Sequence, residues 1–218
     1  MTSVVALGRD ESGAYIAAGA NSAADAVPRA EEERRWIARC VQGETEAFRP
    51  LVVRYQRLAF SVSLRMLGSR PDAEDVVQQA MVDAFNALER FRNEGLANAF
   101  STWLLRIVVN RSKDVLKSKR WTERSVDGDV AEGEAAFAAG TADPEANLTG
   151  QRRRRRLEEA VLSLPTKYRE VIILKDIEEL SYEEMRSILH LPITTLKMRV
   201  VRGRTLMRER IGDLEEPR

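Results

Sequence analysis

The C-terminal part of the sequence gathers basic side chains that could bind nucleic acid. Residues 192–210 contain six lysines and arginines against a single acid, Glu209. Lys and Arg bind phosphates and guanine edges, and Met and Val can contact thymine methyl groups. Leu196, Val200 and Leu206 form an apolar stripe at helical spacing. The pattern predicts either a DNA-reading helix or a basic helix face exposed to solvent.

The residues before this helix favour DNA reading. Ser181, followed three positions later by Glu184, is a capping box that marks the start of a short helix over 182–189. A turn at His190-Leu191-Pro192 then leads into the basic helix, expected over 193–210. A short helix, a tight turn and a longer basic helix are typical of a helix-turn-helix.

A second group of residues combines aromatic and basic side chains. Phe100 and Trp103 precede Arg106, Asn110 and several later lysines and arginines. Stacking rings beside cations suit single-stranded nucleic acid. The alternative is that Phe100 and Trp103 are core residues of a helical domain, whereas Asn110 follows an apolar run and is expected at the surface.

A third group places acids and glutamines on one helix, from Asp72 to Gln79. Ala73, Val77 and Ala80 form its apolar stripe. Paired carboxylates could serve acid–base chemistry or a metal, but no histidine accompanies them, so catalysis is disfavoured. A face that docks a protein partner, or a solvated face, fits these residues better.

The composition excludes several classes of function. One cysteine, Cys40, and one histidine, His190, allow neither an internal disulfide nor a His/Cys metal centre. No nucleophile–base pair or phosphate loop is present, so the sequence predicts neither an enzyme nor a cofactor. No apolar run approaches the roughly 20 residues of a membrane span. We expect a cytoplasmic protein, and because the net charge is only +1, any DNA binding must depend on how the charges are distributed.

Helical periodicity without strand-like alternation predicts an all-α protein of two small helical domains. We expect a disordered tail over 1–30, a helical domain over 31–120, a linker over 121–150 and a helix-turn-helix domain over 151–212. The linker segment has seven acids against one Arg124 and few apolar side chains that could form a core. The helices are expected over 31–42, 44–67, 71–90, 100–119, 152–163, 166–177, 182–189 and 193–210.

An ordered set of short motifs resembles the extracytoplasmic-function (ECF) family of bacterial RNA polymerase sigma factors. The resemblance covers 31–119 and 152–211. Its motifs are Gly43–Phe48, Val53–Gln56, Asp72–Gln79, Phe100–Leu104, Ile107–Asn110, Leu164–Pro165, Leu180–Glu184 and Thr195–Arg199.

The resemblance implies a role for each of the three groups. The third helix would dock on the clamp helices of the polymerase β′ subunit through Asp72, Asp75, Gln78, Gln79 and Asp83. The fourth helix and the loop before it would melt and read the −10 element through Asn93, Phe100, Ser101, Trp103, Arg106, Asn110 and Lys113. The last helix would read the −35 element as duplex, in a domain that lies on the β-subunit flap, through Thr194, Thr195, Lys197, Met198, Arg199, Val201, Arg202 and Arg204.

The sequence departs from the family pattern in four places. The loop over 93–99 is a few residues longer than usual, and Met198 stands where a small residue is more usual. The N-terminal tail and the arginine run over 152–156 are the other two. The resemblance leaves an anti-sigma factor open as a further partner. The competing hypothesis is a helix-turn-helix regulator that binds duplex operators without polymerase, and binding to core polymerase would distinguish the two.

Overall fold

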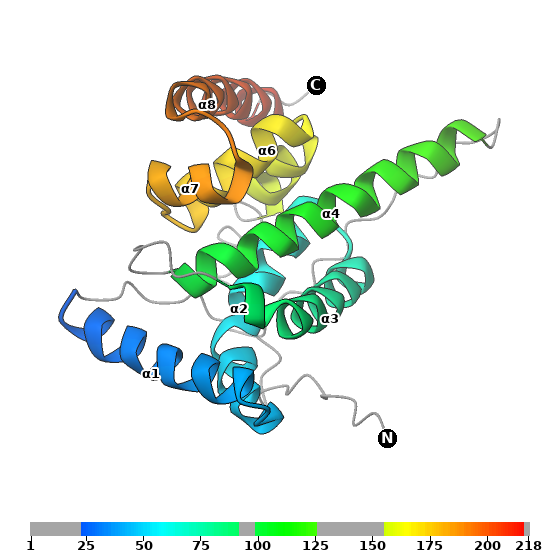
Figure 1. Cartoon of the computed structure of the whole chain (residues 1–218). Helices are drawn as coiled ribbons and strands as arrows, with labels where there is room; N and C mark the ends of the chain where they lie inside the picture. The colour runs from blue at the N-terminus through cyan, green and yellow to red at the C-terminus, as the bar shows by residue number, and fades with distance from the viewer. Residues whose placement is uncertain (1–22, 92–98, 126–154, 216–218) are drawn as a thin grey trace, which may run out of the picture.

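The computed structural model describes residues 23–91, 99–125 and 155–215 (Figure 1). Every regular element in these ranges is helical, which confirms the all-α prediction. None of the described helices is long and apolar enough to cross a membrane. Residues 1–22 of the expected tail, residues 93–98 of the expected loop and most of the expected linker lie outside the described residues.

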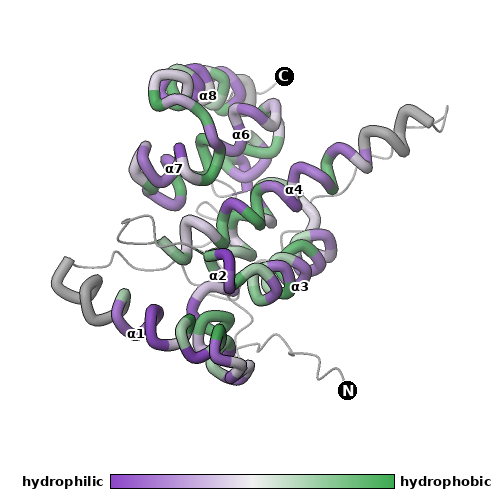
Figure 2. Tube along the Cα trace, in the orientation of Figure 1, coloured by the Kyte–Doolittle hydropathy of each residue, from purple (hydrophilic) through white to green (hydrophobic). Residues whose placement is uncertain are grey.

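The first domain is built from helices of the N-terminal half of the chain. They are α1 (Ala23–Val41), the 3-10 turn η1 (Thr45–Phe48), α2 (Arg49–Leu67), α3 (Arg70–Asn86), the 3-10 turn η2 (Leu88–Arg90) and α4 (Ala99–Ser125). Helices α2, α3 and α4 pack against one another, and Figure 2 shows hydrophobic residues where they approach. Their buried side chains, among them Leu51, Met66, Leu104 and Leu105, form the core that positions the outer faces of α3 and α4.

Local sequence signals fix the junction between α2 and α3. Gly68 ends α2 with a φ of +71°, a left-handed conformation that costs glycine little. Ser69 then caps α3 by accepting a hydrogen bond from the Asp72 backbone N–H. Pro71 lies in the first turn of α3, where its missing N–H leaves no hydrogen bond unmade.

Several helix boundaries differ from the sequence-based expectation. Helix α1 begins at Ala23, within the expected tail, and α4 runs to Ser125, past the expected linker start at 121. The single helix expected over 44–67 is divided into η1 and α2. Pro50 accounts for the division, since it cannot donate to the preceding turn and is tolerated only where a new helix starts.

The second domain contains the C-terminal helices. Helical residues 155–163 are followed by α6 (Thr166–Ile172), the π-helical turn η3 (Ile173–Ile177), α7 (Tyr182–Leu189) and α8 (Ile193–Glu215). The capping box is confirmed: Ser181 accepts from the Glu184 N–H, and Glu184 accepts from the Ser181 N–H. His190 ends α7 with a φ of +53°. The expected helix over 166–177 changes from α to π geometry at Ile173.

The two domains are in contact. Helix α7 packs across α4, and α2 contacts both α6 and η3. Figure 1 shows α6, α7 and α8 lying together on one side of α4, with α3 on the other. The arrangement brings the proposed −10 and −35 helices, α4 and α8, into one compact body.

Candidate nucleic-acid interface

Helix α8 exposes one face and buries the opposite one. Leu196 and Val200 are fully buried against the rest of the domain. Met198 and Val201 are 73% and 64% exposed, an unusual degree for large apolar side chains. The expected −35 residues that share this exposed face are Thr194, Lys197, Met198, Val201 and Arg202.

Two other expected −35 residues are tied to α6 and η3. Arg199 is half-buried and donates from Nη1 to Glu170 Oε1 at 3.1 Å. Arg204 donates from Nη2 and Nε to the two oxygens of Asp176 at 2.5 and 3.0 Å. These hydrogen bonds, followed by the charge of Asp176, raise the pKa of Arg204. Thr195 is half-buried as well. Arg204 remains exposed, but its guanidinium is held by Asp176.

A glycine sets how closely α8 approaches α6. A Cβ on Gly203 would lie 2.8 Å from Ile172 Cγ1, which is too close for two carbon atoms. A larger residue at this position would require Ile172 or the helix to shift, so Gly203 is what allows the close contact. The sequence analysis missed this role, although a lone glycine inside a helical pattern is a signal of close packing.

Tyr182, at the start of α7, lies between two lysines. Lys197 Nζ is 5.6 Å and Lys175 Nζ 5.0 Å from its ring centroid, both within cation–π range. Lys175 also donates to the Leu180 carbonyl at 2.8 Å. The tyrosine thus restrains one of the basic side chains on the exposed face of α8, a contact that sequence spacing does not reveal.

Helix α4 separates its aromatic residues from its polar ones. Phe100 is 1% exposed, and its ring contacts those of Tyr55, Phe91 and Trp103 at centroid distances of 5.3, 5.8 and 5.7 Å. Ser101 is buried too, so neither residue reaches the surface in this conformation. The burial of Phe100 agrees with the alternative that it is a core residue. Asn93 lies outside the described residues.

The remaining expected −10 residues reach the surface of α4 to different degrees. Trp103 and Arg106 are half-buried, and Asn110 is exposed. Lys113 is half-buried because its ammonium forms an ion pair with Glu170 Oε2 at 2.6 Å. Of the members of this set that the structure describes, Trp103, Arg106, Asn110 and Lys113 are therefore the ones that can touch a ligand.

The expected polymerase-binding residues of α3 divide into two groups. Asp75 and Gln78 are exposed. Gln79 is exposed and donates to Asp83 at 3.2 Å. Asp72 is half-buried and accepts from Lys119 at 2.5 Å. Although burial alone would raise the pKa of Asp72, the hydrogen bonds with Lys119 and Ser69 and the lysine charge lower it.

Two apolar side chains extend the exposed face of α3 beyond the expected set. Val82 and Phe85 are exposed, one turn and two turns along the helix from Gln78. Phe85 also contacts the ring of Phe48 at 5.2 Å. Helical periodicity had identified only the apolar stripe that contains Ala73, Val77 and Ala80, and it gave Val82 and Phe85 no role. Apolar centres with polar rims are typical of protein–protein interfaces.

Two family models match the chain. The model described as Sigma-70 region 2 matches residues 51–122, and the model described as Sigma-70, region 4 matches residues 154–207. The first contains α3 and most of α4, and the second contains residues 193–207 of α8. The matched segments thus coincide with the three faces described above.

Curated relatives match over most of their length. The chain is 34% identical to the ECF RNA polymerase sigma factor SigW of Bacillus subtilis, over 83% of this chain and 97% of SigW. It is 34% identical to the ECF RNA polymerase sigma-E factor of Escherichia coli K12, over 82% of this chain and 93% of that protein.

Two solved structures have a similar fold. One is CnrH in complex with the cytosolic domain of CnrY, at 25% identity and a TM-score of 0.59, covering 85% of this chain and 99% of the matched one. The other is the sigma factor RpoE in complex with the anti-sigma factor NepR from Bartonella quintana. Its identity is 21% and its TM-score 0.62, over 78% of this chain and 98% of that one.

Proposed function

This chain belongs to the ECF family of RNA polymerase sigma factors, and on that premise we propose which of its surfaces contact polymerase and promoter. As a sigma factor it binds core RNA polymerase and directs initiation at specific promoters, and it is not an enzyme. The regulator hypothesis accounts for the helix-turn-helix alone, whereas the family match includes region 2 as well.

The outer face of α8 reads the −35 element, and one observation carries this assignment. Met198 and Val201 are exposed side by side on a helix whose opposite face is buried, and Lys197 and Arg202 flank them. Exposed apolar groups between cations match a major groove, in which thymine methyls lie beside guanine acceptors and phosphates. Arg199 and Arg204 instead hold α8 in place through Glu170 and Asp176. This domain would lie on the polymerase β flap.

The surface of α4 reads and melts the −10 element. Asn110 is exposed and can pair with an unstacked base, while Trp103 and Arg106 are accessible enough for stacking and phosphate contact. Lys113 adds a second cation on the same helix. Phe100 and Ser101 support this surface from beneath, because they are buried.

The exposed face of α3 docks on the β′ clamp helices. Asp75, Gln78 and Gln79 supply polar contacts, and Val82 and Phe85 supply apolar area. Asp72 and Asp83 take part indirectly, because Lys119 and Arg111 already pair with them. We further propose that the chain works in the cytoplasm, where polymerase and promoters are found. An anti-sigma factor is a second proposed partner, since a solved structure of similar fold contains one.

Reconstitution with core polymerase tests this assignment. The full chain, titrated into fluorescently labelled core, should bind and should direct transcription from a subset of a promoter library randomised at −35 and −10. A chain that binds −35 duplex without core, and yields no promoter-specific transcript with core, would contradict the proposed surfaces. Two charge-reversal variants form a matched pair. Lys197→Glu should keep core binding and lose −35 selection, whereas Asp75→Lys should lose core binding.

A further inference from the structure

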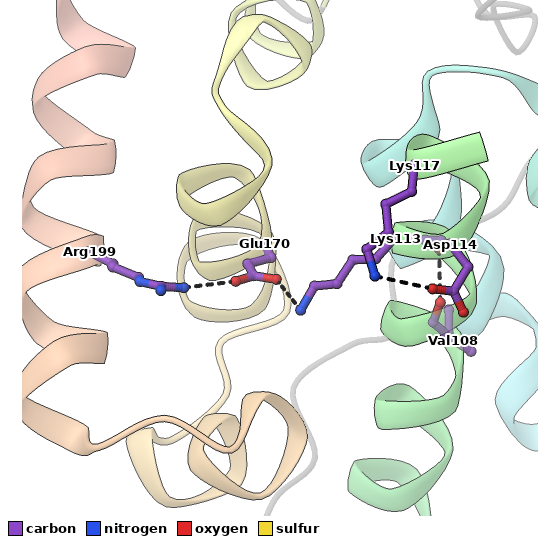
Figure 3. Close-up of polar contacts among 7 residues, drawn as sticks. Val108, Lys113, Asp114, Lys117, Glu170 and Arg199 are labelled. Carbon is purple, nitrogen blue, oxygen red and sulfur yellow. Dashed lines mark hydrogen bonds and ion pairs between the residues drawn. The ribbon is translucent and has the colours of Figure 1, made fainter. Parts of the chain in front are cut away.

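One buried carboxylate joins the two proposed DNA-reading helices. Glu170 lies on α6 and is 3% exposed. Its Oε1 accepts from Arg199 of α8 at 3.1 Å, and its Oε2 pairs with Lys113 of α4 at 2.6 Å (Figure 3). Figure 3 shows the two cations reaching Glu170 from opposite sides. The Arg199 contact lies within one domain, whereas the Lys113 contact crosses between domains.

Other contacts close the same interface farther from the DNA-reading residues. Ser61 Oγ of α2 donates to Glu178 Oε1 at 2.6 Å, and Arg169 Nη1 of α6 donates to the Met66 carbonyl at 2.5 Å. Gly68 adds an apolar contact, since a Cβ there would lie 3.0 Å from Leu162 Cδ1. Lys113–Glu170 is thus the part of this interface that uses a proposed promoter contact.

This closed arrangement does not fit a promoter. The −10 and −35 elements are centred about 25 base pairs apart, which is roughly 85 Å at about 3.4 Å per base pair. In the closed chain a single carboxylate separates Lys113 from Arg199. The 29 residues from 126 to 154 have a contour length of roughly 100 Å, so the covalent chain allows the domains to separate over that distance.

Because Glu170 has two cationic partners, separating the two domains costs little free energy at α6. A buried carboxylate that loses its only partner is strongly destabilising. Glu170 keeps Arg199 when the domains part, because both belong to the second domain. Lys113 alone is released, and it leaves with an uncompensated positive charge on the helix that faces the −10 strand.

We propose that Lys113 and Glu170 form an interdomain latch that holds the free sigma factor closed, and that Lys113 exchanges the Glu170 carboxylate for a promoter phosphate when the factor opens. The proposal rests on the proposed −10 role of α4. The same lysine stabilises the closed chain before promoter binding and the open chain after it. Promoter engagement therefore competes directly with domain closure.

The distance between the domains in the free, full-length chain tests the latch. Spin labels are placed at Glu46→Cys and Glu183→Cys, exposed positions in different domains, in a Cys40→Ser background. Double electron–electron resonance should show mainly one short distance, and core polymerase with promoter DNA should replace it with a long one. Lys113→Met, which removes the charge and keeps most of the aliphatic chain, should raise the open fraction of the free chain about fivefold.

Lys117→Met is the matched control. Lys117 lies one turn farther along α4, and its ammonium pairs with the exposed Asp114 at 3.5 Å in the same helix. It loses the same charge without touching the interface, so its distance distribution should equal that of the parent chain. Ser61→Ala, which removes the donor to Glu178, should open the chain without altering any proposed DNA contact.

The outcomes separate this proposal from the proposed function. A parent chain that is already mainly open, or a Lys113→Met chain that is no more open than Lys117→Met, overturns the latch, and neither result depends on DNA or polymerase. If Lys113→Met opens the free chain yet leaves promoter affinity and its salt dependence unchanged, exchange with a promoter phosphate is overturned. A more open chain with weaker, less salt-dependent promoter binding supports both steps.

Discussion

Asp83 of α3 accepts a hydrogen bond from Arg111 of α4 at 2.6 Å, and the two residues are 28 positions apart in sequence. The contact uses a carboxylate of the proposed polymerase-binding helix to hold the proposed −10 helix. Gln79 donates to the same carboxylate from within α3. The two interfaces of the first domain therefore share a structural connection at Asp83.

Replacing Asp83 should affect stability more than polymerase binding. Asp83→Ala is expected to lower the free energy of unfolding by up to about 1 kcal/mol, because it breaks a partly exposed ion pair. Asp75→Lys, on the exposed face of the same helix, should leave stability unchanged and weaken core affinity. Urea unfolding and a core-binding titration on both variants provide the comparison. The assignment fails if Asp83→Ala weakens core binding as strongly as Asp75→Lys.

Asn110 should act in promoter melting. Asn110→Ala removes an exposed side chain that can pair with an unstacked base, so open-complex formation should fall while affinity for a −35 duplex fragment stays constant. Permanganate footprinting of the −10 thymines measures the melting. Lys117→Met serves as the control variant, because it removes only a positive charge from the same helix. Normal melting by Asn110→Ala would remove base reading from this residue.

Lys197 and Arg208 should differ in what they recognise. Lys197 lies near the N-terminal end of the exposed face of α8 and is a candidate for a base edge, whereas Arg208 lies three turns farther on and should meet phosphate. Loss of a base contact costs about 1–3 kcal/mol and relaxes one position, and loss of a phosphate contact lowers the salt slope by about one. Competition over single-base −35 variants at two salt concentrations measures both. Identical sequence profiles for the parent and Lys197→Ala would show that Lys197 does not read bases.

The pairing of Asp72 with Lys119 should make stability depend on pH. The folded state lowers the pKa of Asp72, mainly through hydrogen bonds that outweigh burial. Its contribution is therefore fully present above the unfolded pKa of about 3.9 and is lost as the pH falls through the lower, folded value. Asp72→Asn should be less stable than the parent at pH 7, and the difference should shrink below about pH 3.9. Urea unfolding of Asp72→Asn and of the parent across pH measures this difference, and a difference that does not change with pH would contradict the role of Lys119.

Helix identity and many helix ends could be predicted because their causes are local. The Ser181–Glu184 capping box acts within one turn and is confirmed. The predicted helix end at residue 67 is confirmed too, because Gly68 stops α2 there in a left-handed conformation. The single helix predicted over 44–67 was wrong, whereas the helix predicted over 166–177 has the predicted bounds but changes its geometry within them. Pro50 divides the first, and a change from α to π geometry interrupts the second.

Residue roles within the proposed interfaces could be predicted less well because they depend on packing. Arg199 and Arg204 look equivalent to Lys197 and Arg202 in sequence, yet their partners, Glu170 and Asp176, lie 29 and 28 positions away. Likewise, the aromatic cluster around Phe100 draws on two helices, α2 and α4, and on Phe91 after η2. Periodicity identifies a face but does not show which of its side chains are already engaged.

The missing side chain at Gly203 has a consequence for how promoter preference can change. Because α8 rests on the side chain of Ile172 at that point, a larger residue would have to displace Ile172 or lift α8 away from α6. When α8 is lifted, every base-reading side chain moves together relative to the groove. Substitutions on the outer face can retune single positions of the −35 element one at a time. A substitution at Gly203, which never meets DNA, would instead shift the entire recognition pattern in one step.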